Sequence, residues 1–183
     1  MTRGLIGIAL AILLTGCAAG TAVSVAPGYR YTLQPPAAGP KFTALQEIVI
    51  TAPDGREERI VSQLENDESS TRLAALTPLG QTLLTAHFDG RSVQTRSALP
   101  LAPVLDAGFV IALIQLALWP ESAVAEGLGV GMRLVTQGNN RELEGGGKIL
   151  WTINVHGVGV PYDSVHIRSE DARLALRITT LAE

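Results

Sequence analysis

The chain has 183 residues, of which 46% are hydrophobic, 17% charged and 4% aromatic, and its formal net charge is −3. So few charges argue against a disordered chain, and the acidic balance argues against a nucleic-acid binder, which needs a basic surface. A single cysteine, Cys17, excludes an intramolecular disulfide and any site built from several cysteines. What remains is one globular domain, either free or attached to a membrane.

The first residues have the form of a secretory signal peptide, assigned to residues 1–16. Arg3 gives a short basic start, and Gly4 to Leu14 is an uninterrupted apolar run. As a helix this run would span about 16 Å, roughly half of a hydrocarbon core, so it is too short to cross a membrane.

Leu14-Thr15-Gly16-Cys17 resembles the bacterial lipobox. The resemblance implies that the chain is cut before Cys17 and that Cys17 then carries three acyl chains, two through its sulfur and one on its amine. Three chains would anchor the protein to a membrane far more firmly than a single one does. The residue after the cysteine is Ala18 and not aspartate, which is typical of outer-membrane lipoproteins facing the periplasm. The alternative is ordinary secretion with cleavage after Ala19.

Residues 18–26 are small and uncharged, and residues 35–40 are rich in proline. The range 17–40 is therefore predicted to be a flexible tether, with a short strand at Tyr29–Leu33. A single domain is expected over residues 41–183. Its pattern is that of strands separated by turns, with hairpin signals at Pro53-Asp54-Gly55 and Asp89-Gly90. The predicted strands are 42–51, 57–65, 71–77, 81–88, 91–96, 132–137, 148–156, 164–168 and 173–180.

The late strands alternate in the way that antiparallel sheets with one buried face do. Ile149, Trp151, Ile153 and Val155 are expected on the buried face of one strand. In the next, Leu174, Leu176 and Ile178 are expected on the buried face.

A helix is predicted between the two groups of strands, with Pro103 as its first residue and Pro120 as its end. Val104 to Trp119 is apolar all round, so this helix should be buried and not lie on the surface. A second short helix is expected at Glu121–Leu128. The predicted fold class is α+β: a large curved antiparallel sheet, or unclosed β-barrel, of about eight or nine strands, with an apolar helix on its concave face.

This architecture resembles the LolA/LolB-like fold of the outer-membrane lipoprotein receptor and its periplasmic carrier. Several motifs also resemble a proteobacterial lipoprotein family of unknown function found in aryl-polyene (xanthomonadin-like) gene clusters. These motifs are Leu76–Gly80, Phe88–Gly90, Leu113–Pro120 and Arg141–Leu143. The family brings no catalytic residues with it. The resemblance implies an apolar cavity, and an aryl-polyene conjugate as one ligand.

No motif for catalysis or for a cofactor stands out, so a non-catalytic protein without cofactor or metal is expected. Ser164 and His166 have the residue types of a catalytic triad, but on a strand they would share a solvated face. His87, His156 and His166 lack the spacing of a preformed metal site. The glycines at 127, 129 and 131 follow a helix, whereas a phosphate-binding loop precedes one.

The candidate ligand-lining residues are Phe109, Leu113, Leu116, Trp119 and Trp151. They form either plain core or the wall of a cavity for an apolar chain. The first hypothesis is therefore an outer-membrane lipoprotein that binds or transfers an apolar lipid-like molecule and binds no nucleic acid. Its alternatives are a scaffolding lipoprotein without a small ligand and, third, a periplasmic hydrolase; protein partners cannot be named from the sequence.

Overall fold

The computed structural model describes residues 21–97 and 106–181. The predicted signal peptide, Cys17 and Pro103 lie outside these residues, as does the beginning of the helix predicted from Val104. In the described part the order of elements is β1 (Ala22–Ala26), β2 (Tyr29–Thr32), the 3-10 helix η1 (Pro36–Ala38), β3 (Phe42–Thr51), β4 (Glu57–Asn66), β5 (Thr71–Leu76), β6 (Thr82–Phe88), β7 (Val93–Ser97), α1 (Ala107–Leu118), α2 (Glu121–Gly127), β8 (Met132–Gln137), β9 (Asn140–Gly145), β10 (Lys148–His156), β11 (Ser164–Ser169) and β12 (Leu174–Thr180).

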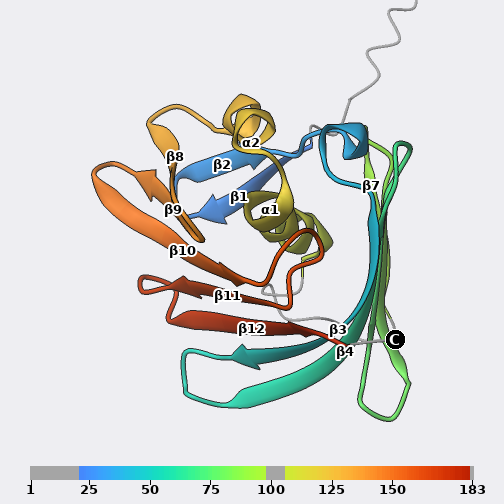
Figure 1. Ribbon diagram of the computed structural model, residues 1–183. Helices are drawn as coiled ribbons and strands as arrows, with labels where there is room; N and C mark the ends of the chain where they lie inside the picture. Colours follow the sequence, from blue (N-terminus) through green and yellow to red (C-terminus); the bar gives the residue numbers. More distant parts are fainter. Residues whose placement is uncertain (1–20, 98–105, 182–183) are drawn as a thin grey trace, which may run out of the picture.

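Ten strands form one antiparallel sheet in the order β7-β6-β5-β4-β3-β12-β11-β10-β9-β8. The sheet curves around α1, and its two end strands, β7 and β8, are not paired with each other (Figure 1). The predicted α+β class, with an unclosed barrel around an apolar helix, is therefore confirmed. In the described residues, no helix is long and apolar enough to cross a membrane.

The predicted hairpins set the register of the sheet. The turn at Pro53-Asp54-Gly55 joins β3 to β4, and Gly55 has a φ of 81°, which glycine adopts without strain. This turn pairs Gln46 of β3 with Ser62 of β4. Since side chains alternate between the two faces of a strand, the pairing puts both side chains on the concave face together.

The prediction of a flexible tether is wrong for residues 21–40. Strands β1 and β2 form a separate antiparallel hairpin, and β1 packs against α1. Val25, Tyr31 and Leu33 of this segment are buried in the same core as the helix. Their burial supplies the stabilisation that local sequence lacks, because small residues and prolines give no strong preference of their own. The short strand expected at 29–33 is present as β2.

Two details of the late strands also differ from the prediction. The sheet has ten strands because residues 140–145, which are not among the predicted strands, form β9 between β8 and β10. In β10, Ile149 points to solvent and is 49% exposed, whereas Leu150 is buried beside Trp151. A bulge between Ile149 and Trp151 shifts the register, which reverses the alternation at this point. Leu174, Leu176 and Ile178 lie on the inner side of β12 as predicted.

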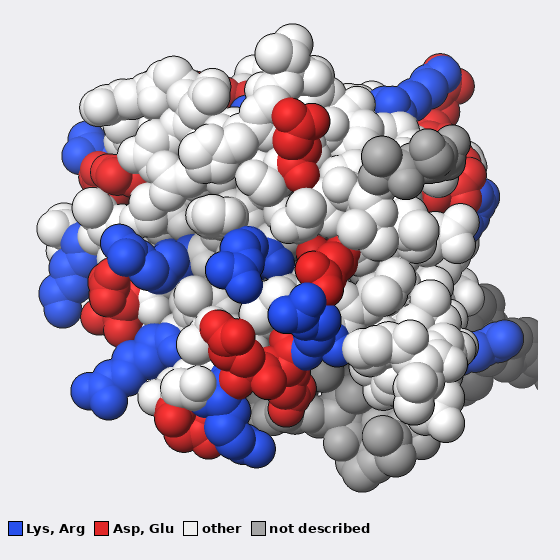
Figure 2. Space-filling view, turned by 60° about the horizontal axis from the view of Figure 1, so that its bottom comes forward, with Lys and Arg blue, Asp and Glu red and all other residues white. Residues whose placement is uncertain are grey.

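The outer face of the sheet is solvated. Figure 2 shows basic and acidic side chains interspersed over the side of the molecule that forms the bottom of Figure 1. Arg59 and Glu47 make an ion pair there at 2.6 Å, and Arg168 pairs with Glu170 at 3.0 Å. Such exposed pairs contribute about 0–1 kcal/mol each, so the fold is held mainly from its concave side.

Candidate functional site

Helix α1 has two faces with different surroundings. One, here called the hairpin face, consists of Gly108, Gln115 and the capping residue Trp119, and lies against the segment 21–40. The other, here called the cavity face, lies against the concave face of the sheet and consists of Phe109, Val110, Leu113, Ile114, Ala117 and Leu118. The absence of a polar stripe, noted in the sequence, follows from this arrangement, since protein covers the helix on both sides.

Gln115 fixes the hairpin face by two hydrogen bonds. Its side-chain carbonyl oxygen accepts from the backbone N–H of Gln34 at 2.8 Å, and its side-chain amide donates to the carbonyl oxygen of Gln34 at 2.8 Å. Gln115 is fully buried. The only strongly polar residue inside α1 is therefore satisfied by backbone groups and ties the helix to the chain that follows β2.

Trp119 ends the helix in a tight apolar contact. A Cβ atom placed on Gly39 would lie 2.2 Å from Cε2 of Trp119, so only glycine allows the chain to pass this closely over the indole ring. Arg141, from the concave side of β9, donates to the carbonyl oxygens of Leu116 at 3.1 Å and Trp119 at 2.7 Å. A cation at this end of a helix also complements the helix dipole.

The N-terminus of α1 is held by Asp106, whose side chain accepts a hydrogen bond from the backbone N–H of Phe109 at 2.9 Å. Tyr31 of β2 is buried in the core, and burial raises the pKa of its hydroxyl well above the ordinary value. The tyrosine therefore stays neutral. Between them, Asp106, Arg141 and the segment 21–40 position both ends and one full side of the helix.

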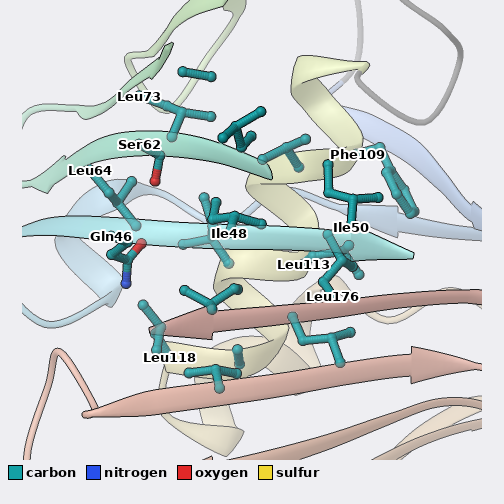
Figure 3. A pocket seen from close by; sticks show the side chains of 18 of the residues that line it. Gln46, Ile48, Ile50, Ser62, Leu64, Leu73, Phe109, Leu113, Leu118 and Leu176 are labelled. Atoms are coloured by element: carbon teal, nitrogen blue, oxygen red, sulfur yellow. The ribbon is translucent and has the colours of Figure 1, made fainter. Parts of the chain in front are cut away.

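The cavity face borders an almost wholly apolar cavity between α1 and the sheet (Figure 3). The helix contributes its six cavity-face residues. The sheet contributes Gln46, Ile48, Ile50, Ile60, Ser62, Leu64, Leu73, Ala75, Leu84, Val165, Ile167, Leu174, Leu176 and Ile178. Phe109, Val110 and Ile114 are only half-buried, as are Ile48, Leu176 and Ile178. These half-buried side chains, here called the mouth, are the part of the lining that solvent reaches most.

The space inside is narrow in this structure. About 870 Å³ around the cavity and its mouth holds no atoms, part of it open to solvent, but only about 70 Å³ admits a water-sized molecule. That smaller volume holds a few waters or a short piece of hydrocarbon. A longer chain would fit only if the side chains at the mouth moved aside.

Two polar side chains interrupt the apolar wall. Gln46 and Ser62 face each other across β3 and β4, are 6% and 1% exposed, and neither side chain hydrogen bonds to any described residue. The hydroxyl of Ser62 is fully buried, whereas the amide of Gln46 keeps a small accessible surface. Leaving a buried polar group without a partner costs about 1–3 kcal/mol. No lining residue is ionisable. The cavity thus combines an apolar wall with one neutral, unpartnered polar pair.

The structure divides the five predicted lining residues into two groups. Phe109 and Leu113 line the cavity. Leu116, Trp119 and Trp151 do not; they are buried in the core around it. Trp151 donates its ring N–H to the carbonyl oxygen of Val25 at 2.7 Å and makes a tilted ring contact with Phe109, with 5.7 Å between the ring centroids, so it joins the hairpin to the helix.

The residues considered for catalysis lie away from the cavity. Ser164 and His166 are on the outer face of β11, and neither side chain hydrogen bonds to a described residue. The ring of His166 lies 5.6 Å from that of His156 across the strand pair, a proximity that sequence spacing does not reveal. In residues 21–97 and 106–181, no three His, Cys, Asp or Glu side chains come close enough to hold a metal ion.

Gln46 and Ser62 were not singled out from the sequence, although a signal for them exists. In β3, inward positions alternate as Phe42, Ala44, Gln46, Ile48 and Ile50, so a glutamine stands in an otherwise apolar series. Ser62 stands between Ile60 and Leu64 in the same way. A polar residue in the buried phase of a strand needs either a partner or a function.

A family model described as "Protein of unknown function (DUF3261)" matches residues 43–182. No curated protein matches the chain. Among solved structures, the chain is similar to a lipoprotein-sorting protein domain from Vibrio parahaemolyticus, with 9% identity, a TM-score of 0.42, and coverage of 76% of this chain and 83% of that one. A LolA superfamily protein from Nitrosomonas europaea matches with 10% identity, a TM-score of 0.40, and coverage of 78% and 84%. At these TM-scores the likeness does not bear on function.

Proposed function

The chain belongs to the DUF3261 family, and from the geometry of its interior we propose that it binds an apolar lipid-like molecule between α1 and the sheet and hands it on. The observation that carries the proposal is the cavity face of α1, which borders an apolar cavity with half of its residues only half-buried, while the opposite face is buried and held by the hydrogen bonds of Gln115. The proposed role is binding without catalysis.

Binding would widen the existing cavity. Because α1 is fixed along its hairpin face, the groups that would yield are the half-buried side chains at the mouth, such as Val110, Ile114 and Leu176. A ligand burying roughly 300 Å² of apolar surface would gain about 7 kcal/mol before the costs of association. Once the costs of association are subtracted from this free energy, the affinity is modest, which suits a carrier that must also release its ligand.

The place of action we propose is the periplasmic face of the outer membrane, with the chain anchored through acylated Cys17. Only residues 18–20 separate Cys17 from Thr21, where the described part of the chain begins. Four residue steps reach at most about 14 Å. The domain would therefore work close to the lipid surface, where an apolar ligand is delivered or collected.

The ligand class proposed first is an aryl-polyene conjugate, because the motifs at 76–80, 88–90, 113–120 and 141–143 resemble the family found in those gene clusters. Its long unbranched chain matches the largely aliphatic wall of the cavity. The competing role, a scaffold without a small ligand, requires the interior to stay closed.

Native mass spectrometry tests the proposal. The full chain carrying Cys17→Ser, purified without detergent from the envelope fraction of its own host, is expected to retain an apolar adduct whose mass identifies the ligand class. Ala117→Phe fills the cavity from the helix side and should abolish the adduct. Ala74→Phe makes the same change on β5 outside the cavity and should leave the adduct in place.

An adduct-free mass in repeated preparations, together with no binding of an added apolar dye, would contradict the proposal and favour the scaffold. An adduct that survives Ala117→Phe would place the ligand somewhere other than this cavity.

A further inference from the structure

The chemistry of the cavity wall restricts the class of ligand further, an inference that rests on the function proposed above. Figure 3 shows Gln46 and Ser62 on neighbouring strands, toward the same end of the cavity as Leu64 and Leu118, with Phe109 and Ile50 toward the other end. Phe109 is half-buried, and so is Ile48, the next inward residue of β3, whereas Gln46 and Ser62 are buried. The polar pair is thus a buried part of the cavity wall, at the end away from Phe109.

The pair is positioned by rigid elements. Gln46 and Ser62 are direct partners in the register of β3 and β4, the two longest described strands, and on its other side β3 pairs with β12, with Gln46 opposite Thr180. The hydroxyl of Thr180 already donates to the carbonyl oxygen of Tyr162 at 2.7 Å. The hydroxyl opposite Gln46 on β12 is therefore already engaged, and the amide of Gln46 is left to other partners.

The donors and acceptors of the pair fit a neutral group. A glutamine amide offers two N–H donors and a carbonyl acceptor, and a serine hydroxyl both donates and accepts. No lysine, arginine, histidine or carboxylate lines the cavity, so a charged group would be desolvated there without a counter-charge. A hydroxyl group or an ester carbonyl can be held by such a pair at no comparable penalty.

We propose that the cavity selects an apolar chain that carries a neutral hydrogen-bonding group, and that Gln46 and Ser62 bind this group inside the cavity. The apolar wall supplies affinity for any hydrocarbon. The pair supplies specificity, because a plain hydrocarbon leaves both side chains without a partner while a hydroxyl or ester-bearing chain satisfies them.

A ligand-pair experiment tests the proposal. Dodecan-1-ol, dodecane and dodecanoate compete with the neutral dye N-phenyl-1-naphthylamine for the full chain carrying Cys17→Ser. The readout is the ratio of the Kd for dodecane to the Kd for dodecanol, which cancels effects on chain binding common to both. In the double variant Gln46→Met/Ser62→Ala this ratio should fall at least about tenfold, since two hydrogen bonds to the alcohol are lost. Dodecanoate should bind more weakly than the alcohol in the parent chain.

Ser70→Ala is the matched control. Ser70 is 2% exposed and its hydroxyl also lacks a partner among the described residues, but it does not line the cavity. The ratio should not change in this variant. A crystal structure with dodecanol should place its oxygen within hydrogen-bond distance of Gln46 and Ser62.

An unchanged ratio in the double variant, an equal fall in Ser70→Ala, or a dodecanol oxygen at the mouth with waters still on the polar pair would each overturn the inference. In those cases dodecane and dodecanol still bind, so the proposed function survives. If neither displaces the dye from the parent chain, the proposed function fails, and the inference falls with it.

Discussion

The hairpin face and the cavity face of the same helix, α1, differ in how completely they are packed. On the hairpin face, Gln115 has both of its side-chain hydrogen bonds and Trp119 is fully buried under Gly39. On the cavity face, Phe109 and Ile114 are half-buried, and Gln46 in the sheet wall of the same cavity has no partner among the described residues.

The two faces therefore have different roles: the hairpin face fixes the helix, and the cavity face borders the cavity. Cavities in protein cores normally collapse as far as their surroundings allow, because unfilled space loses dispersion contacts. Here α1 cannot move toward the sheet to close the cavity without breaking the contacts of its hairpin face. The contacts of the hairpin face therefore keep the cavity incompletely filled, and substitutions on the two faces should change the free energy of unfolding by different amounts.

The largest expected effect is that of Trp119→Ala. Removing a fully buried indole from the hairpin face should lower the free energy of unfolding by about 3–5 kcal/mol, because the space under Gly39 cannot close. Phe109→Ala on the cavity face should cost less than half as much, since Phe109 is already half-buried beside empty space. Urea unfolding followed by circular dichroism measures both, and equal losses would mean that the two faces are packed alike.

Two buried glutamines give a sharper form of the comparison. Gln115→Met should destabilise by about 2–4 kcal/mol, because it leaves the N–H and the carbonyl group of Gln34 unpaired in the core. The same change at Gln46 removes an unpartnered amide from an apolar wall and should be neutral or stabilising. The urea midpoint should fall in Gln115→Met and should stay unchanged or rise in Gln46→Met. A similar loss in both would show that Gln46 has a structural partner.

The sequence predicted the features that follow from local pattern, and did not predict those that depend on tertiary contacts. Alternation and turn chemistry predicted most strands, the class of the sheet and the burial of α1, because these follow from local pattern and from turns such as Pro53-Asp54-Gly55. Strands β1 and β9 were missed because their residues have weak strand preference. The structure of β1 depends on burial against α1, and that of β9 depends on pairing with β8 and β10.

The candidate site was predicted only in part for a related reason. A helix without a polar stripe carries no information about which side meets which neighbour, so Phe109 and Leu113 could not be separated from Leu116 and Trp119. The pairing of Gln46 with Ser62 depends on register over a hairpin. Only the tertiary structure shows that no described group satisfies them.

A smaller effect is expected where β9 meets the end of α1. Arg141→Met should cost about 1–2 kcal/mol, because the carbonyl oxygens of Leu116 and Trp119 lose their donor and the helix end loses a cation. Arg133→Met is the control: it removes an exposed ion pair with Glu144, also at β9, and should cost less than about 1 kcal/mol. If the two costs are equal in thermal unfolding, Arg141 does not fix the helix.

The smallest effect concerns the turn that holds the segment 21–40 from the other side. Asn66 donates from its side-chain amide to the carbonyl oxygens of Pro36 and Pro40, and the next residue, Asp67, organises the turn. Hydrogen bonds from the Ser69 hydroxyl and from the backbone N–H groups of Ser69 and Ser70 lower the pKa of Asp67 from 3.8 to about 2.

Because this pKa is lowered on folding, the ionised carboxylate stabilises the folded state above about pH 4, and its contribution is lost as the pH falls from 4 through 2. Asp67→Asn should therefore be less stable than the parent chain at pH 6, and the difference should vanish by about pH 2. Ser69→Ala, which keeps the charge but removes the strongest donor, should move the loss to a higher pH. Urea midpoints measured from pH 6 to pH 2 test this, and a constant difference between Asp67→Asn and the parent would show that the turn does not depend on the ionised carboxylate.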